Sequence, residues 1–359
     1  MRILLLSPEM FLADGGIARI LRLYLKALGE ICGPAGRVDS LVLNDRPGRD
    51  PRLARYANAR LGEHRGCDGR RWRFVLGAVR LARSADLLIC GHLHHLPIAR
   101  LAAVFNPRLR YCLVAHGIEV WRPYSWIERR ALLGAHRVLC VSDYTRRQIR
   151  RFCPSLPADR LVVVPNTLDP AFAIELDQGA PAAPFAGPRI LTVARLTRAD
   201  SYKGVDTLIE AMPLIRRHYP LAELRVVGQG DDRPRLAALA TRLGAAGVVN
   251  FLGPIDDDAL RLEYATCDFF ALPSRREGFG LVFLEAMARG KPCLGARAGG
   301  TPEVINETVG QLVEYGDIPG IAGAVASLMR RPRDSEVVRR HAATFAYPEF
   351  QRRLAAVLD

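Results

Sequence analysis

The stretch SRREGFGLVFLEAMARGKP, residues 274–292, places a charged and glycine-rich turn directly before a helical pattern. The turn follows a short apolar run at 269–272, which predicts a buried parallel strand, and residues 281–288 predict a helix. The turn therefore lies at the carboxyl end of a strand, where open α/β sheets bind their ligands. Because the first amides of the following helix favour an anion, the sequence predicts a phosphate site here.

Two acidic side chains belong to this stretch: Glu277 in the turn and Glu285 on the second turn of the predicted helix. Two carboxylates beside an anion repel it unless each accepts hydrogen bonds from hydroxyl groups, as a sugar and a ribose would offer. A polyol phosphate meets both demands. The simpler interpretation is that the acidic residues only interact favourably with the helix dipole.

The pair, with GFG between its members, resembles the E-x7-E signature of retaining nucleotide-sugar glycosyltransferases of the GT-B fold, family 4. The resemblance implies an α/β protein with two Rossmann-like parallel-sheet lobes that face each other across a cleft. It implies that Glu277 and the GFG backbone hold the transferred sugar and that Glu285 holds the ribose. The donor-binding residues implied in this stretch are Glu277, Gly278, Phe279, Gly280, Leu281 and Glu285.

Two cations precede this stretch, Arg195 after a predicted strand at 189–194 and Lys203 at the start of a predicted helix. A guanidinium fork and a compact ammonium together suit a diphosphate, and each charge-assisted contact is worth about 1.5–3 kcal/mol. The pair resembles the diphosphate clamp of the same family, with a small insertion at 197–201. Both could instead be solvated surface charges.

A second glycine turn, Gly15-Gly16, stands between a predicted strand at 2–7 and a predicted helix at 17–28. Glycines let backbone amides approach an oxyanion, although a plain tight turn explains them equally well. The turn resembles the loop with which these glycosyltransferases contact the donor diphosphate from the opposite lobe. Further apolar runs, at 37–43, 86–90, 110–115, 137–142 and 161–164, alternate with helical patterns and predict a parallel sheet.

His116 stands where one of these strands ends, so it can hydrogen-bond a sugar hydroxyl or a backbone carbonyl. The resemblance implies a cleft histidine near the transferred sugar, and a surface turn is the alternative. A second group, His92, His94 and His95, has no evident companion ligand beyond Cys90, and we expect it to face the acceptor. Trp121, Tyr124 and Trp126 with neighbouring arginines suit a membrane interface, a sugar or a lipid diphosphate, or else simply a core.

Later features separate the lobes and argue against other cofactors. Residues 166–188 are rich in Pro, Ala and Gly and predict a linker between domains at 1–165 and 189–342, with a terminal helix within 343–359 that returns to the first domain. The GQG at 228–230 lacks the third glycine of a nicotinamide site. The acidic triplet at 256–258 predicts a helix cap rather than a metal site. By resemblance, Phe251 and Leu252 meet the nucleotide base.

Composition supports a folded protein of two domains, with 49% hydrophobic residues and no signal peptide or membrane span in the first residues. Residues 1–165 hold 28 Lys+Arg against 13 Asp+Glu, a net charge of +15, whereas residues 166–359 hold 23 against 24, a net charge of −1. A basic lobe attracts anionic lipid or phosphorylated substrates. The eight cysteines, without a C-x-x-C pair, predict reduced core thiols.

We therefore expect a metal-independent retaining glycosyltransferase that needs no cofactor besides its nucleoside-diphosphate sugar, with mannose or glucose favoured. The catalytic set comprises His116, Arg195, Lys203 and Glu277. The expected acceptor is a lipid-diphosphate-linked oligosaccharide of bacterial polysaccharide assembly, which would place the protein in the cytoplasm, peripheral on the inner face of the plasma membrane. No nucleic acid is expected as a partner. A soluble acceptor, a same-fold nucleotide-sugar epimerase and a non-catalytic sugar-nucleotide-binding protein remain alternatives.

Overall fold

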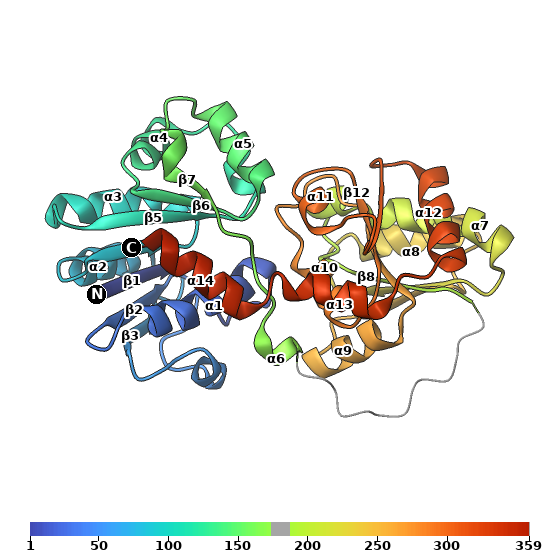
Figure 1. The fold of residues 1–359 in the computed structure, drawn as a ribbon, viewed down its shortest axis with the longest axis horizontal. Helices are drawn as coiled ribbons and strands as arrows, with labels where there is room; N and C mark the ends of the chain where they lie inside the picture. The colour runs from blue at the N-terminus through green and yellow to red at the C-terminus, as the bar shows by residue number, and fades with distance from the viewer. Residues whose placement is uncertain (174–186, 359) are drawn as a thin grey trace. The chain divides into compact units, whose positions relative to one another are not determined.

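The computed structural model describes residues 1–173 and 187–358 and divides the chain into two compact units (Figure 1). Unit 1 comprises Met1–Asp169 with Tyr347–Asp359, and unit 2 comprises Pro170–Ala346. Most of the predicted linker, residues 174–186, lies outside the described residues. Each unit is built on one parallel sheet with helices, so the α/β class and the two Rossmann-like lobes are confirmed.

Unit 1 contains a seven-stranded sheet with the order β3-β2-β1-β4-β5-β6-β7, in which every neighbouring pair is parallel. The strands are β1 Arg2–Ser7, β2 Arg37–Val42, β3 Leu61–Gly66, β4 Leu87–Cys90, β5 Arg110–Ala115, β6 Arg137–Cys140 and β7 Leu161–Val163. The chain reverses direction across the sheet between β1 and β4. This reversal is the switch point at which doubly wound sheets bind ligands beyond their carboxyl edge.

The helices of unit 1 lie on both faces of the sheet. They are α1 Gly16–Ile31, α2 Arg71–Ala82, α3 Leu96–Phe105, α4 Trp126–Leu133, α5 Asp143–Phe152 and α14 Tyr347–Leu358, with 3-10 turns η1 Pro51–Arg55, η2 Leu93–His95, η3 Ile118–Val120 and η4 Ala158–Arg160. The sequence sets their starts: α4 begins with a capping box between Ser125 and Glu128, and Ser142 caps α5.

Unit 2 repeats the same strand order with six strands, β10-β9-β8-β11-β12-β13. The strands are β8 Arg189–Val193, β9 Glu223–Val227, β10 Val249–Gly253, β11 Phe269–Leu272, β12 Cys293–Ala296 and β13 Gly310–Val313. The switch point lies between β8 and β11, whose carboxyl ends lead to Arg195 and Glu277. The helical segments are α6 Pro170–Ala173, η5 Arg198–Lys203, α7 Val205–His218, α8 Arg233–Arg242, α9 Asp257–Thr266, α10 Leu281–Ala288, α11 Thr301–Val304, α12 Ile318–Arg330 and α13 Ser335–Ala343.

Apolar side chains of the strands and the covering helices form the cores. In unit 1, Leu4, Leu6 and Leu88 pack with Phe74 of α2 and Leu132 of α4, and all five are almost fully buried. In unit 2, residues of β8, β9 and β11 pack with α7 and α12. The eight cysteines are free and buried, which confirms the expected core thiols.

The terminal helix α14 belongs to unit 1, where it packs on α1. Phe350 lies edge-on to the buried ring of Tyr24, with 5.0 Å between ring centroids, and the hydroxyl of Tyr347 donates to Glu30 at 2.6 Å. The last residues of the chain thereby complete the first lobe. Within residues 1–173 and 187–358, no helix combines the length and hydrophobicity needed to cross a bilayer.

Candidate active site

Lys203 and Glu277, predicted separately along the chain, meet at the carboxyl edge of the unit 2 sheet. The Nζ of Lys203 donates to Oε2 of Glu277 at 2.6 Å, and the two side chains are 20% and 14% exposed. Lys203 ends η5, and the backbone amide of Arg275 donates to the carbonyl of Tyr202 at 2.9 Å, which joins η5 to the loop after β11. The result is a largely buried charge pair at the carboxyl edge of the sheet.

Helix α10 begins beside this pair without a side-chain cap. Gly280 precedes it with a φ of 91°, and a Cβ at this position would lie 2.4 Å from the ring of Phe283. Only glycine fits there, so the GFG turn positions the first amides of α10 toward the carboxyl edge. The first amides of a helix have no carbonyl one turn before them, and the helix dipole favours an anion there. In α10 the amide of Phe283 already donates to the carbonyl of Gly280 at 3.0 Å, so the amides of Leu281 and Val282 are the candidates for an anion.

The glycine turn Gly299-Gly300 packs against the backbone of Glu277. The amide of Gly300 donates to the carbonyl of Glu277 at 2.7 Å, and a Cβ on Gly299 would lie 2.4 Å from the same carbonyl oxygen. The GGTPE segment, at 299–303, therefore fixes the backbone of Glu277 before any ligand arrives.

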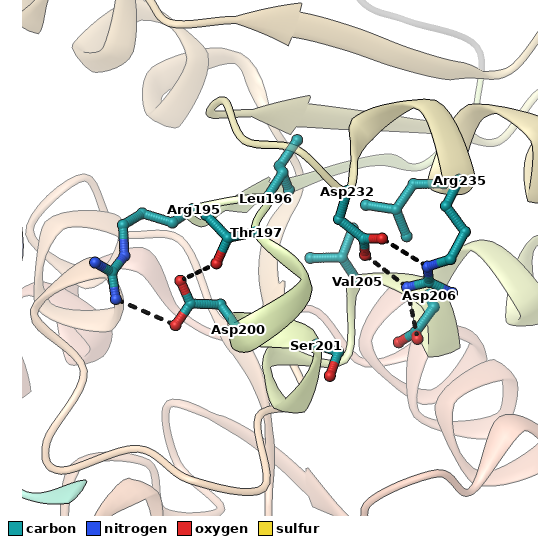
Figure 2. A pocket seen from close by; sticks show the side chains of 10 residues that line it. Arg195, Leu196, Thr197, Asp200, Ser201, Val205, Asp206, Asp232 and Arg235 are labelled. Atoms are coloured by element: carbon teal, nitrogen blue, oxygen red, sulfur yellow. Dashed lines mark hydrogen bonds and ion pairs between the residues drawn. The ribbon is translucent and has the colours of Figure 1, made fainter.

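Arg195 lies in the loop after β8, with its side chain 72% exposed. Figure 2 shows its guanidinium reaching toward the carboxylate of Asp200, to which Nη2 donates at 3.1 Å. Asp200 is almost fully buried and also accepts from the hydroxyls of Thr197 and Tyr202, both at 2.8 Å. Burial and this carboxylate raise the pKa of Tyr202, so the phenol stays protonated. Neither Asp200 nor Tyr202 was predicted from the sequence. Through Asp200, Arg195 is connected to Tyr202, the neighbour of Lys203 in the chain.

The hollow drawn in Figure 2 is not large enough for a nucleotide. Its volume is about 10 Å³, which is room for one water molecule. On its far side Arg235 donates to Asp232 at 2.7 Å through each of two nitrogens, which ties the start of α8 together. We therefore interpret the residues around this hollow as support for the Arg195 loop, and not as a ligand site.

Glu285 is only 5% exposed and lies on the second turn of α10, as predicted. Its Oε2 accepts a hydrogen bond from the hydroxyl of Tyr264 at 2.9 Å. Glu277 and Glu285 are thus held by different partners, Lys203 and Tyr264. Tyr264, which lies on α9, was not predicted from the sequence, and the contact of Glu285 with a ribose stays a prediction.

The predicted base-binding residues, Phe251 and Leu252, lie on the edge strand β10. The pairing of β10 with β9 shifts register between Phe251 and Gly253, so Leu252 is bulged out of the ladder. An edge strand leaves one side of its backbone unpaired, which suits recognition of a base through backbone groups. Gly228 is explained by packing, because a Cβ there would lie 1.8 Å from the carbonyl oxygen of Ala194.

In unit 1, the turn before α1 is held by a buried carboxylate. Asp45 accepts from the amides of Met10, Phe11 and Leu12 at 3.0–3.2 Å and so fixes the loop after β1. Gly15 has an ordinary extended conformation, with a φ of −74°, and a Cβ on it would meet nothing within 4 Å. Neither backbone strain nor packing demands this glycine, which weakens the interpretation as a plain tight turn.

His116 follows β5 and is fixed in one tautomer. Its Nε2 lies 2.9 Å from the carbonyl oxygen of Gly91, which can only accept, so Nε2 carries the proton and Nδ1 is an acceptor. Burial lowers the pKa of His116 to about 4, opposed by the bond to Gly91. Nδ1 of the neutral imidazole is therefore an acceptor, and its contact with a sugar hydroxyl stays a prediction. Of the two predicted partners, His116 donates to the backbone carbonyl.

His92, His94 and His95 line a cavity of about 620 Å³ at the carboxyl ends of β1, β2 and β4. This volume falls in the range of small-molecule sites. Burial lowers the pKa of His92 to about 4 and that of His95 to about 3, and Nδ1 of His95 is buried without a recorded partner. The lining residues are Pro8, Glu9, Ile17, Leu43, Asn44, Arg71, Phe74, Val75, His92, His94, His95 and Ile98.

The three aromatic residues after His116 differ in burial: two pack against the core and one is exposed. Trp121 and Tyr124 pack against the core of unit 1, and their polar atoms donate to Thr145 at 3.3 Å and to the carbonyl of Val120 at 2.6 Å. Trp126, in contrast, is 72% exposed at the start of α4. The core interpretation therefore holds for two of the three rings.

The acidic triplet caps a helix, as predicted. Asp256 precedes α9 and its carboxylate accepts from the amide of Ala259 at 2.8 Å. Over the residues that the structure describes, no three His, Cys, Asp or Glu side chains gather in a group that could hold a metal ion.

Comparison with known proteins identifies the family. Residues 22–172 match the model for Glycosyltransferase Family 4, and residues 187–331 match that for Glycosyl transferases group 1. The GDP-mannose-dependent alpha-(1-6)-phosphatidylinositol monomannoside mannosyltransferase of Mycolicibacterium smegmatis is 32% identical over 301 residues, which cover 79% of this chain and 72% of that protein. The chain belongs to glycosyltransferase family 4. The protein of the same description from Mycobacterium tuberculosis is 35% identical over 253 residues, which cover 65% of this chain and 63% of that protein.

Solved structures share the fold of this family-4 glycosyltransferase. HepE of Anabaena, in complex with UDP, superposes with a TM-score of 0.78 at 21% identity. The match covers 100% of this chain and 99% of the HepE chain. Sucrose-phosphate synthase of Thermosynechococcus elongatus gives a TM-score of 0.77 at 22% identity, with 99% and 98% covered. The expected GT-B fold is confirmed, and the relatives named above support a hexosyltransferase.

Proposed function

We propose that this chain is a retaining glycosyltransferase that moves a hexose from a nucleoside-diphosphate sugar to an acceptor hydroxyl. The observation that carries the proposal is the contact of Lys203 with Glu277 beside the uncapped start of α10. An ammonium and a row of amides suit a diphosphate, and a carboxylate beside them suits the hydroxyls of the attached sugar. The alternative of an epimerase loses support because the chain belongs to a family of glycosyltransferases.

The proposed chemistry stabilises the leaving group. As the bond from C1 of the sugar to the diphosphate oxygen breaks, negative charge grows on the diphosphate. Lys203, Arg195 and the amides near Gly280 and Leu281 would neutralise it, and each preorganised donor of this kind contributes about 10²–10³-fold to turnover. The acceptor oxygen bonds to C1 on the same face and passes its proton to a phosphate oxygen, so the configuration at C1 is retained.

Three further residues would orient the donor. Glu277 and the GFG backbone would bind hydroxyls of the transferred sugar, Glu285 would bind the ribose, and Nδ1 of His116 would accept from a sugar hydroxyl. This chemistry asks for no metal. The measurement for that claim is turnover after exhaustive treatment with EDTA, which should leave the rate unchanged, whereas loss of activity that Mg²⁺ or Mn²⁺ restores would contradict it.

GDP-mannose is the donor that we favour, because the relatives at 32% and 35% identity are described as GDP-mannose-dependent. The test is incubation of the protein with a panel of UDP-, GDP- and ADP-sugars and measurement of nucleotide release with and without acceptor. Release of GDP from GDP-mannose that an acceptor accelerates supports the proposal. A protein that releases no nucleotide from any sugar would be a binding protein, and one that alters the sugar without release would be an epimerase.

For the acceptor we propose a lipid-linked carbohydrate bound in the cavity of unit 1. The cavity combines apolar walls, from Ile17, Phe74 and Ile98, with Arg71 at α2, so it suits a carbohydrate that carries phosphate and lipid. The relatives named above act on a phosphatidylinositol monomannoside by their description. We extend this to a lipid-diphosphate oligosaccharide of polysaccharide assembly, used by an enzyme peripheral on the inner face of the plasma membrane.

A soluble acceptor is the second candidate, because a D-inositol 3-phosphate glycosyltransferase of Saccharomonospora viridis is 31% identical over 65% of this chain. Transfer of labelled mannose to extracted lipid, compared with transfer to inositol phosphate in water, separates the two. Label that stays in the organic phase supports the lipid-linked acceptor, and label found only in the aqueous product supports the soluble one.

A further inference from the structure

The helices α2, α3 and α4 form one layer on unit 1 (Figure 1). Right-handed crossovers from β3 to β4, β4 to β5 and β5 to β6 run in one direction across the sheet, which places these helices on the same face. The crossover through α1 runs in the opposite direction, so α1 and the attached α14 lie on the other face. The packing supports this placement, because α2 contacts α3, α3 contacts α4, and all three helices contribute to one core cluster.

This layer carries most of the exposed large apolar side chains. Among the described residues ten such side chains are exposed, and three lie elsewhere, namely Leu12, Leu221 and Leu262. The other seven are Trp72 and Leu76 of α2, Leu101, Val104 and Phe105 of α3, and Trp126 and Ile127 of α4. We refer to these seven residues as the apolar face. Trp72 is 61% exposed and Trp126 is 72% exposed, so neither ring is part of the core.

Two of the three helices that carry the apolar face, α2 and α3, contain arginine and no acidic residue. The stretch 69–118, which contains α2 and α3, holds eight arginines and a single acidic residue, Asp86. Asp86 is occupied at the start of β1, where it accepts from the amide of Arg2 at 2.7 Å. Two arginines lie directly over the exposed indoles, Arg73 at 5.2 Å from the Trp72 centroid and Arg130 at 5.5 Å from that of Trp126.

We infer that the apolar face docks on the surface of an anionic lipid bilayer. Tryptophan with aliphatic side chains partitions into the headgroup region, while arginine reaches the lipid phosphates, so the two kinds of residue act together. A second copy of the chain fits poorly, because the lobe has a net charge of +15 and would meet the same sign of charge. Charge complementarity therefore selects anionic lipid as the occupant.

The apolar face shares its helices with the cavity of unit 1. On α2, Arg71, Phe74 and Val75 line the cavity while Trp72 and Leu76 point outward, and on α3 Ile98 lines it. A lipid-linked acceptor could thus keep its chain in the bilayer while its sugar enters the cavity. This last step rests on the proposed function, whereas binding to vesicles does not.

Docking on vesicles can be followed by the intrinsic tryptophan fluorescence of the protein. It has three tryptophans, and Trp72 and Trp126 lie on the apolar face while Trp121 is partly buried and bonded to Thr145. On addition of vesicles with about one third phosphatidylglycerol, we expect the emission to shift to the blue and to become shielded from a soluble quencher. Vesicles of phosphatidylcholine alone should give a much smaller change. Unchanged emission with anionic vesicles would overturn the inference.

Matched variants locate the contact. The double variant Leu76→Ser with Leu101→Ser should lower the vesicle partition coefficient about ten-fold or more, because two leucines no longer enter the headgroup region. The control is Leu221→Ser with Leu262→Ser, where the same change is made at exposed leucines of unit 2, and its partition should equal that of the parent. Equal loss in both pairs would overturn the inference, as would a chain that dimerises through this face by sedimentation and leaves vesicles unbound.

Donor chemistry is measured separately from docking. Nucleotide release from GDP-mannose in the absence of vesicles should be equal in both double variants and the parent. If the proteins bind anionic vesicles but release no nucleotide, the docking surface stands and the proposed function fails. If they release nucleotide but ignore vesicles, the reverse holds.

Discussion

Replacement of Lys203 by alanine tests the diphosphate site most sharply, because the structure gives this side chain one charged partner. Its ammonium donates to Glu277 at 2.6 Å, and both side chains are at least four-fifths buried. The substitution removes one charge-assisted contact to the diphosphate, worth about 1.5–3 kcal/mol, so the Kd for GDP should rise about 10–150-fold. Turnover should fall about 10²–10³-fold, since in the proposed mechanism the same charge stabilises the leaving group.

A matched control separates charge from fold. Lys291 is the other lysine of unit 2, and it stands just before β12, at the amino edge of the sheet. Lys291→Ala should leave both the Kd and the turnover within about three-fold of the parent. Lys203→Ala also exposes Glu277 without its partner, which costs about 1–3 kcal/mol of stability, so thermal unfolding is measured beside the titration.

Unchanged GDP binding by a folded Lys203→Ala variant would refute the proposed contact. If Lys203→Ala is folded by circular dichroism and binds GDP within about three-fold of the parent, the ammonium does not contact the diphosphate. A parallel loss in Lys291→Ala would instead indicate a general effect of net charge. Isothermal titration with GDP, at low and high salt, distinguishes a local contact from long-range attraction.

The remaining predictions concern the second carboxylate, the glycine turns and the buried histidines. Glu285→Gln should weaken GDP binding about ten-fold, whereas Tyr264→Phe, which removes only the internal hydrogen bond, should lower stability by about 1 kcal/mol and spare the affinity; equal affinity loss in both would assign Glu285 a structural role. Gly15→Ala should leave the unfolding temperature unchanged and reduce turnover, while Gly280→Ala should destabilise the fold, because its φ of 91° and the ring of Phe283 exclude a Cβ; a destabilised Gly15→Ala would contradict this. His95 has its pKa lowered from 6.5 to about 3 by burial, so the unfolded chain binds a proton that the folded chain does not, and stability present above pH 6.5 is lost as the pH falls. Between neutral pH and about pH 5 this histidine should cost about 2 kcal/mol, and His95→Gln should flatten the pH dependence of unfolding by that amount, an unchanged slope being the contrary result.

The buried strands of both sheets could be predicted because each has an apolar run, and the observed bounds of β1, β5 and β11 agree with the expected residues. Two strands were missed, β3 and β13. Both lie at sheet edges. The sequence of β3, LGEHRG, carries charge, and that of β13, GQLV, is short, because edge strands need no continuous apolar run and tolerate polar residues.

The site shows the same division between local and distant information. Glu277, Gly280 and the start of α10 follow one another along the chain, so their arrangement could be predicted from a strand, a turn and a helix. Contacts between distant segments could not, such as Tyr264 with Glu285 or Asp200 with Arg195. A tyrosine on a helix or an aspartate in a turn has no local signal for such a partner, since the fold alone brings it there.

Hydrogen–deuterium exchange of the protein with and without saturating GDP tests the central claim most directly. If the diphosphate binds at the start of α10 beside Lys203, the amides near Gly280 and Leu281 should exchange more slowly when GDP is present, together with those at the junction of η5 and α7. Unchanged exchange at these amides, in a sample that binds GDP by titration, would place the nucleotide elsewhere and contradict the account.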